Sequence, residues 1–140
     1  MDLIARCLTD LKRHEGFRQF PYRDTRGILT IGYGRNLESR GITAEEASYL
    51  LENDILRAVK SLRERLSGFA QLGPARQAVL VNMAVNLGVN GLLGFRKTLA
   101  AIEVGDYAEA AREMLRSRWA EQVPARAREL AKLMEGGNLK

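Results

Sequence analysis

Residues 14–36 read HEGFRQFPYRDTRGILTIGYGRN, a turn-rich segment that carries two carboxylates, Glu15 and Asp24, and the hydroxyl of Thr30. Within it, DTRG at residues 24–27 has Asp at the first position and Gly at the fourth, which is typical of a type I turn. One interpretation is that Asp24 only caps this turn. The other is that the turn brings Asp24 together with Thr30 in a site, and the register of the two strands decides between them.

Two registers are open to the predicted hairpin. With a two-residue loop, Asp24 pairs with Gly27 and Thr30 points to the opposite face. With a type I turn followed by a left-handed Gly27 as a G1 bulge, Asp24 pairs with Ile28 and Tyr22 pairs with Thr30, so that Asp24 and Thr30 share a face. Because glycine at position 27 is what the second register requires, the hairpin can direct a carboxylate and a hydroxyl into one space.

The first helix is predicted from an apolar stripe with the spacing i, i+3, i+4, i+7. Its members are Ile4, Cys7, Leu8 and Leu11. The helix should end at about Gly16, and Cys7 should be a buried core thiol. Glu15 lies four residues beyond Leu11, so we expect it to face inward at the negative end of the helix dipole. Burial and the dipole would both raise the pKa of Glu15 toward the value that a general acid needs.

The longest predicted helix covers residues 43–66. It opens with a capping box formed by Thr43 and Glu46, and its apolar positions keep helical spacing without a breaker. A continuous helix of this length would extend for about 35 Å at 1.5 Å per residue. We expect it to connect two lobes of the protein.

Later helices are predicted from their first residues. Pro74 starts a helix whose apolar residues cover most of its circumference, which is typical of the middle of a bundle. Asp106 and Glu109 have capping-box spacing at the start of another helix. Pro124 starts a last, basic amphipathic helix.

Three further side chains in the second half of the chain have two interpretations each. Asn82 and Asn86 lie four residues apart, and satisfied core amides and a cleft-facing pair explain their spacing equally well. Trp119 has the helical spacing of a core anchor, and we prefer that interpretation to a binding role.

The composition is that of a compact globular protein, with 140 residues of which 46% are hydrophobic and 28% charged. A single cysteine excludes an internal disulfide, as suits a protein kept in a reducing compartment. No apolar run reaches the roughly 20 residues that cross a bilayer, and the N-terminus is amphipathic, unlike a secretory signal. We therefore expect a soluble protein that does not insert stably in membranes and has no export signal of its own.

The formal net charge of +5 and the pI near 9.7 suggest an anionic partner. Nucleic acid, a membrane surface and the bacterial cell wall all qualify by charge alone. The basic residues are scattered along helices without the interleaved aromatics of a stacking platform, so a nucleic-acid partner is not expected. His14 is the only histidine and has no second ligand cluster beside it, so neither a metal site nor a cofactor is predicted.

Two carboxylates and a hydroxyl suit glycoside hydrolysis. This reaction needs an acid that protonates the leaving oxygen, and a base together with a group that orients the attacking water. The pattern E-G-(x)7-D-(x)2-G-(x)2-T-I-G-(x)-G is filled by Glu15, Gly16, Asp24, Gly27, Thr30, Ile31, Gly32 and Gly34. In this pattern, in NMAVNLGVNGLLGF at 82–95 and in SRWAEQVPARA at 117–127, the chain resembles the bacteriophage lysozymes of the T-even type. These are members of glycoside hydrolase family 24, also called endolysins or muramidases, and the resemblance covers nearly the whole chain.

The resemblance implies roles for individual residues. Glu15 would be the proton donor, Asp24 the carboxylate opposite it, and Thr30 the holder of the attacking water. Arg126 matches the arginine that pairs with the catalytic glutamate across the cleft. Arg35 departs from the family, which usually has histidine after IGYG. The positions that correspond to saccharide contacts are Asn36, Val85, Thr98 and Glu113.

The implied fold is α+β, mainly α, and lysozyme-like with two lobes. It would have a small antiparallel sheet lobe at residues 14–42, a connecting helix at 43–67, and a helical lobe formed by 1–13 and 68–140. The implied activity is hydrolysis of the β-1,4 bond between N-acetylmuramic acid and N-acetylglucosamine in bacterial peptidoglycan. Such an enzyme would be a monomer that accumulates in the host cytoplasm and reaches the periplasm and wall after a holin permeabilises the membrane.

Two alternatives remain open. A lytic transglycosylase also uses a catalytic glutamate but lets the sugar's own hydroxyl attack, which leaves a 1,6-anhydro end; the presence of both Asp24 and Thr30 argues against it. A non-catalytic basic helical protein that binds the wall or nucleic acid would have no activity at all. Mass spectrometry of the products tests the first alternative, and a turbidity assay on purified peptidoglycan beside a salt-dependent DNA-binding measurement tests the second.

Overall fold

The computed structural model describes residues 2–138 and is mainly helical with one small sheet. The predicted α+β, mainly α fold class is therefore confirmed. Contacts divide the chain into two compact units, Met1–Tyr49 and Leu50–Lys140, and the boundary falls inside helix α3 (Ala44–Arg65). The predicted division, in which residues 1–13 join the helical lobe, stays a prediction.

The first unit carries a three-stranded antiparallel sheet in the order β1–β2–β3. Its elements are α1 (Leu3–Glu15), β1 (Arg18–Arg23), β2 (Leu29–Gly32), β3 (Arg35–Asn36), α2 (Leu37–Arg40) and the start of α3. Asp2 caps α1, because its side chain accepts a hydrogen bond from the Ala5 amide at 2.8 Å. At the other end the amide of Gly16 donates to the Lys12 carbonyl, so the helix ends at the predicted glycine.

The apolar stripe of α1 is exposed. Leu8 and Leu11 expose 54% and 51% of their surface, and α1 contains no buried residue. Cys7 is exposed as well, so the prediction of a buried core thiol is wrong. Within the first unit, α1 approaches the β2–β3 turn through Lys12 and Glu15 near its C-terminal end, which leaves the stripe uncovered.

Helix α3 confirms the helix predicted over residues 43–66. Its capping box has both expected hydrogen bonds, from the Glu46 amide to Thr43 Oγ1 at 3.1 Å and from the Thr43 amide to Glu46 Oε1 at 2.8 Å. Over its 22 residues the helix rises about 33 Å. Neither α3 nor any other helix within residues 2–138 is long and apolar enough to cross a membrane.

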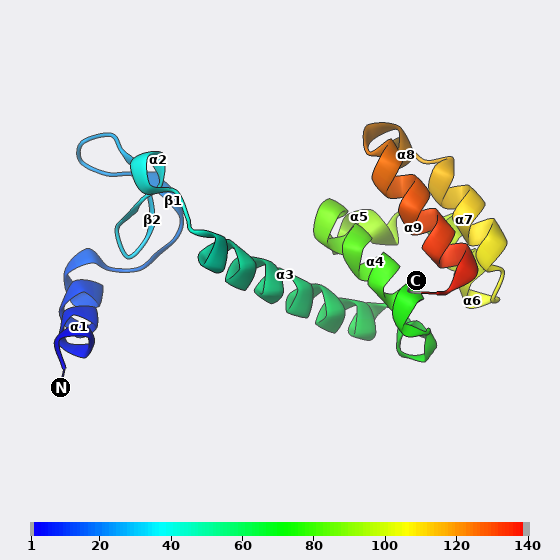
Figure 1. Cartoon of the computed structure of the whole chain (residues 1–140), viewed down its shortest axis with the longest axis horizontal. Helices are drawn as coiled ribbons and strands as arrows, with labels where there is room; N and C mark the ends of the chain where they lie inside the picture. Colours follow the sequence, from blue (N-terminus) through cyan, green and yellow to red (C-terminus); the bar gives the residue numbers. More distant parts are fainter. Residues whose placement is uncertain (1, 139–140) are drawn as a thin grey trace. The chain divides into compact units, whose positions relative to one another are not determined.

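The second unit is a bundle of helices (Figure 1). After the C-terminal part of α3 come η1 (Phe69–Gln71), α4 (Pro74–Leu87), α5 (Val89–Leu93), α6 (Arg96–Glu103), α7 (Tyr107–Leu115), α8 (Arg118–Gln122) and α9 (Pro124–Gly136). Pro74 and Pro124 are the first residues of α4 and α9, and the Asp106 side chain caps α7 at the amide of Glu109, as predicted. Helix α7 packs against α6 and α9, while α4 packs against α5 and α9.

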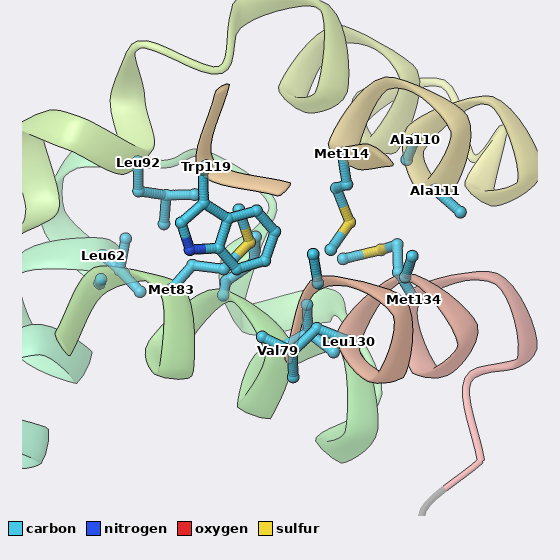
Figure 2. Packing of buried hydrophobic residues seen from close by; sticks show 14 of the residues in the cluster. Leu62, Val79, Met83, Leu92, Ala110, Ala111, Met114, Trp119, Leu130 and Met134 are labelled. Atoms are coloured by element: carbon cyan, nitrogen blue, oxygen red, sulfur yellow. The ribbon is translucent and has the colours of Figure 1, made fainter. Parts of the chain in front are cut away.

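The core of the second unit is built from aliphatic, methionine and alanine side chains. Figure 2 shows them converging from several helices around Met83 and Trp119. Those below 2% exposure are Leu62, Val79, Leu80, Met83, Leu92, Ala110, Met114, Ala127 and Met134, and the polar Thr98 is equally buried at 1%. Trp119 is 3% exposed and packs edge-on against Phe95 with ring centroids 6.0 Å apart, so its predicted role as a core anchor is confirmed.

Candidate active site

Glu15 is the last residue of α1, where the chain leaves the helix and enters the sheet. Its side chain is exposed, so the prediction that it faces inward is wrong for the first unit. The carboxylate nevertheless has a defined neighbour. It lies against the backbone of Gly34, where an added Cβ atom would be 2.8 Å from Glu15 Oε2 and 3.1 Å from Cδ. Only glycine leaves room for the carboxylate in this position.

The turn that contains Gly34 is joined to the end of α1 by aromatic contacts. Tyr33 and Gly34 connect β2 to β3. The Tyr33 ring lies 5.6 Å from that of Phe17, measured between centroids, and Lys12 Nζ lies 5.5 Å from the Tyr33 centroid. Residues on both sides of Glu15 therefore hold the helix end beside the turn, which fixes the backbone from which the carboxylate extends.

The hairpin between β1 and β2 adopts the second of the two predicted registers. Tyr22 pairs with Thr30, and the Asp24 amide donates to the Ile28 carbonyl at 2.9 Å. The Gly27 amide donates to the Asp24 carbonyl at 2.9 Å, and Gly27 has a φ of 79°, as a G1 bulge requires. Asp24 and Thr30 therefore belong to the same face of the hairpin.

Asp24 also caps its own turn, and its role in a site stays a prediction. Its Oδ1 atom accepts hydrogen bonds from the amides of Arg26 at 2.8 Å and Ile28 at 2.9 Å. The bond from Ile28 is the main cause that lowers the pKa of Asp24 below its usual value, and the nearby Arg26 charge adds to it. The carboxylate is thus ionised at neutral pH, and within residues 2–138 no hydrogen bond engages Oδ2.

Thr30 is held in one orientation in the centre strand of the sheet. The residue is 4% exposed, and its hydroxyl donates to the Ile28 carbonyl at 2.8 Å. A hydroxyl whose proton is committed in this way can act only as an acceptor toward a further partner. Such an acceptor, on the same face of the hairpin as an ionised carboxylate, is suited to receive one hydrogen of a water molecule.

Arg126 lies on α9 and lines a groove of about 880 Å³ in the second unit. Val85, Asn82 and Asn86 of α4 line the same groove. Both asparagines are exposed, which favours the cleft-facing interpretation over core amides, and Asn86 Oδ1 accepts a hydrogen bond from Trp119 Nε1 at 2.8 Å. The predicted pairing of Arg126 with Glu15, which is in the first unit, stays a prediction.

The other residues predicted to contact saccharide lie elsewhere. Asn36 caps α2 by accepting a hydrogen bond from the Ser39 amide at 3.1 Å. Thr98 is 1% exposed, and with Glu113 it lines a separate hollow on the second unit. Glu113 is bound to Arg116 at 2.6 Å. The structure therefore brings Val85 together with Arg126, but places Thr98 and Glu113 at another hollow.

Arg35, which departs from the family pattern, has partners that the sequence did not reveal. Its guanidinium donates to the Gly41 carbonyl and to Glu46 Oε1, both at 3.0 Å, and to Glu46 Oε2. The hydrogen bonds from Arg35 are the largest cause that lowers the pKa of Glu46 to about 2. Arg35 is thereby bonded to Glu46 of the capping box at the start of α3. The sequence predicted the capping box itself but not its bond to Arg35.

Comparisons with known proteins show to which proteins the chain is similar. A family model described as phage lysozyme matches residues 12–135. The chain is 33% identical to the probable T4-type lysozyme 1 of Dictyostelium discoideum, over 92% of this chain and 93% of that protein. It is 30% identical to the endolysin of Salmonella phage P22, over 79% and 80% of the two chains. The pre-baseplate central spike protein Gp5 of Enterobacteria phage T4 is 29% identical over 92% of this chain and 27% of its own length.

Proposed function

The chain belongs to the phage lysozyme family and is a peptidoglycan-hydrolysing lysozyme, and from this premise we propose that Glu15, Asp24 and Thr30 carry out the hydrolysis. The bond cleaved is the β-1,4 link between N-acetylmuramic acid and N-acetylglucosamine. The observation that carries the proposal is the bulged register of the β1–β2 hairpin, since it puts Asp24 and Thr30 on one face. The alternative register would have separated them.

Glu15 is the general acid in this mechanism. Its carboxyl group donates a proton to the glycosidic oxygen as the bond to the anomeric carbon breaks, so that the leaving sugar departs as a neutral alcohol. The contact with Gly34 supports the role, because a proton donor must be held in one place to act on one oxygen.

Asp24 and Thr30 prepare the water that attacks the anomeric carbon. The free Oδ2 of the ionised Asp24 takes one hydrogen of the water, and Thr30 Oγ1 accepts the other, which directs a lone pair of the water at the carbon. The proton released by the water passes to Asp24, while Glu15 is left ionised. Exchange with solvent then restores both groups, and the configuration at the anomeric carbon is inverted.

The groove on the second unit supplies binding surface for the glycan. Amide groups of Asn82 and Asn86 can bond to sugar hydroxyls, and the aliphatic side chain of Val85 can pack against an apolar sugar face. For Arg126, which lines the same groove, the proposed role is the one that the resemblance implies, pairing with the catalytic glutamate. The net charge of +5 attracts the enzyme to the anionic wall.

The enzyme acts on the wall from the periplasm as a monomer. It is made in the host cytoplasm and reaches its substrate after a holin permeabilises the membrane. The likeness to a protein named endolysin supports this route.

The variant Glu15→Gln tests the proposal, with Glu45→Gln as the matched control on the exposed first turn of α3. Glu15→Gln should lower the rate of clearing of a purified peptidoglycan suspension by at least about 100-fold. Its circular dichroism and thermal midpoint should match those of the control. Substantial lysis by folded Glu15→Gln would exclude the acid role, and 1,6-anhydro ends in the wild-type products would show a transglycosylase in place of a hydrolase.

A further inference from the structure

Glu38 lies in α2, just after the end of strand β3, where the sheet narrows from three strands to two. The last pair between β2 and β3 is Thr30 with Asn36. The next amide on that side of β2, from Leu29, has no strand residue opposite it. It donates instead to Glu38 Oε1 at 3.0 Å, so the side chain of Glu38 continues the hydrogen-bonded edge beyond the strand.

The same carboxylate oxygen reaches the other strand of the hairpin. Glu38 Oε1 accepts a hydrogen bond from Arg23 Nη1 at 3.0 Å, and this Nη1 atom also donates to the Gly27 carbonyl at 3.0 Å. Arg23 and Leu29 are the strand partners that flank the turn at residues 24–27. We call these four residues, Glu38, Arg23, Leu29 and Gly27, the Glu38 bracket.

Asp24 depends on the turn that the Glu38 bracket encloses. Its Oδ1 atom is bound to two amides of that turn, those of Arg26 and Ile28, so the direction of its carboxylate follows the backbone of the turn. Given the function proposed above, we infer that Glu38 is a positioning residue for Asp24. Through the bracket it keeps Oδ2 aimed at the site of the attacking water.

The bracket contributes little to global stability, because its ion pair is exposed. The side chains of Arg23 and Glu38 are 66% and 47% exposed, and such pairs are screened by solvent. Its effect is local: without Glu38 the fold persists, but the turn samples more conformations. The turnover number kcat should therefore fall, while KM and the thermal midpoint change little.

Four variants test this inference with solubilised peptidoglycan strands as substrate. Glu38→Ala removes the acceptor, and Glu38→Asp keeps the charge but shortens the side chain by one methylene. Glu38→Gln removes the charge but keeps an oxygen acceptor for Leu29 and Arg23. Glu45→Ala, on an exposed glutamate of the same unit, is the control for loss of a negative charge.

The first readout is steady-state kinetics. Glu38→Ala and Glu38→Asp should each lower kcat by about tenfold or more with KM within about twofold of wild type. Glu38→Gln and Glu45→Ala should stay near the wild-type values. An unchanged kcat in Glu38→Asp would overturn the inference, and this variant decides the matter even if Glu38→Ala does not fold.

The second readout is the titration of the Asp24 carboxyl carbon by NMR, which does not depend on activity. Removing the negative charge of Glu38 would by itself lower the pKa of Asp24, whereas loosening the hydrogen bonds from Ile28 and Arg26 would raise it. We expect a rise in Glu38→Ala and none in Glu38→Gln. A fall in both would overturn the inference, whereas full lysis by Asp24→Asn would instead refute the proposed function.

Discussion

A substitution at Gly34 can displace the carboxylate of the proposed acid, Glu15, without replacing Glu15 itself. In Gly34→Ala the new Cβ would lie 2.8 Å from Glu15 Oε2, and ordinary contact begins at 3.4 Å, so the oxygen must move by about 0.6 Å. Because the end of a glutamate side chain moves easily, this displacement costs little stability. It does matter for catalysis, where a shift of about 1 Å can lower the rate about 100-fold, so we expect a loss of at least about tenfold.

The control for this experiment is Gly105→Ala in the loop before α7. Gly34 and Gly105 have φ values of 79° and 76°, so alanine should destabilise both variants by a similar amount, about 1–3 kcal/mol. At Gly105 no atom lies within 4 Å of the added Cβ. Unfolding in urea should therefore give similar losses, while the turbidity assay should show a large defect only in Gly34→Ala. Equal lytic activity in the two variants would refute the idea that the glycine places the Glu15 carboxylate.

Three further outcomes are expected. Arg126→Ala should lower lytic activity and move one limb of its pH profile, and an unchanged profile would count against its action on Glu15. Because the pKa of Glu46 is lowered from about 4.5 to about 2, its ion pair with Arg35 stabilises the protein fully above pH 4.5 and loses that effect as pH falls through 2. The difference in stability between wild type and Arg35→Met should therefore be constant above pH 4.5 and shrink as pH falls to 2, toward what the bond to the Gly41 carbonyl contributes; a difference that does not change with pH would contradict this assignment. Thr30→Val, which keeps the shape but loses the hydroxyl, should slow hydrolysis sharply with little change in substrate binding, as measured by separate kcat and KM values.

Features encoded by neighbouring residues were predictable from the sequence. The capping box of Thr43 and Glu46, and the helix starts at Pro74 and Pro124, follow from local backbone chemistry and were confirmed. The hairpin register was predictable as one of two alternatives, because a left-handed glycine at position 27 suits only the bulged form.

Features that depend on distant partners were not predictable. The apolar spacing around Cys7 indicated a helix face but carried no information on what covers it, and in the first unit that face is exposed. Arg35 binds Glu46, eleven residues further along the chain, and Glu38 binds an amide nine residues before it. Neither pair has a helical or strand period, so a pattern search cannot find them. The contact between Glu15 and Gly34 was hidden for the same reason.

The most direct test of the proposed mechanism is the configuration of the first product. Inverting glycosidases hold their two carboxyl groups about 6.5 to 9.5 Å apart to admit a water, whereas retaining enzymes hold them about 5 to 5.5 Å apart. Since Asp24 and Thr30 are proposed to orient that water, we predict the wider separation and inversion. NMR of a digest recorded before mutarotation should show the α-anomer of the new reducing end first, and a β-anomer as the initial product would contradict the mechanism.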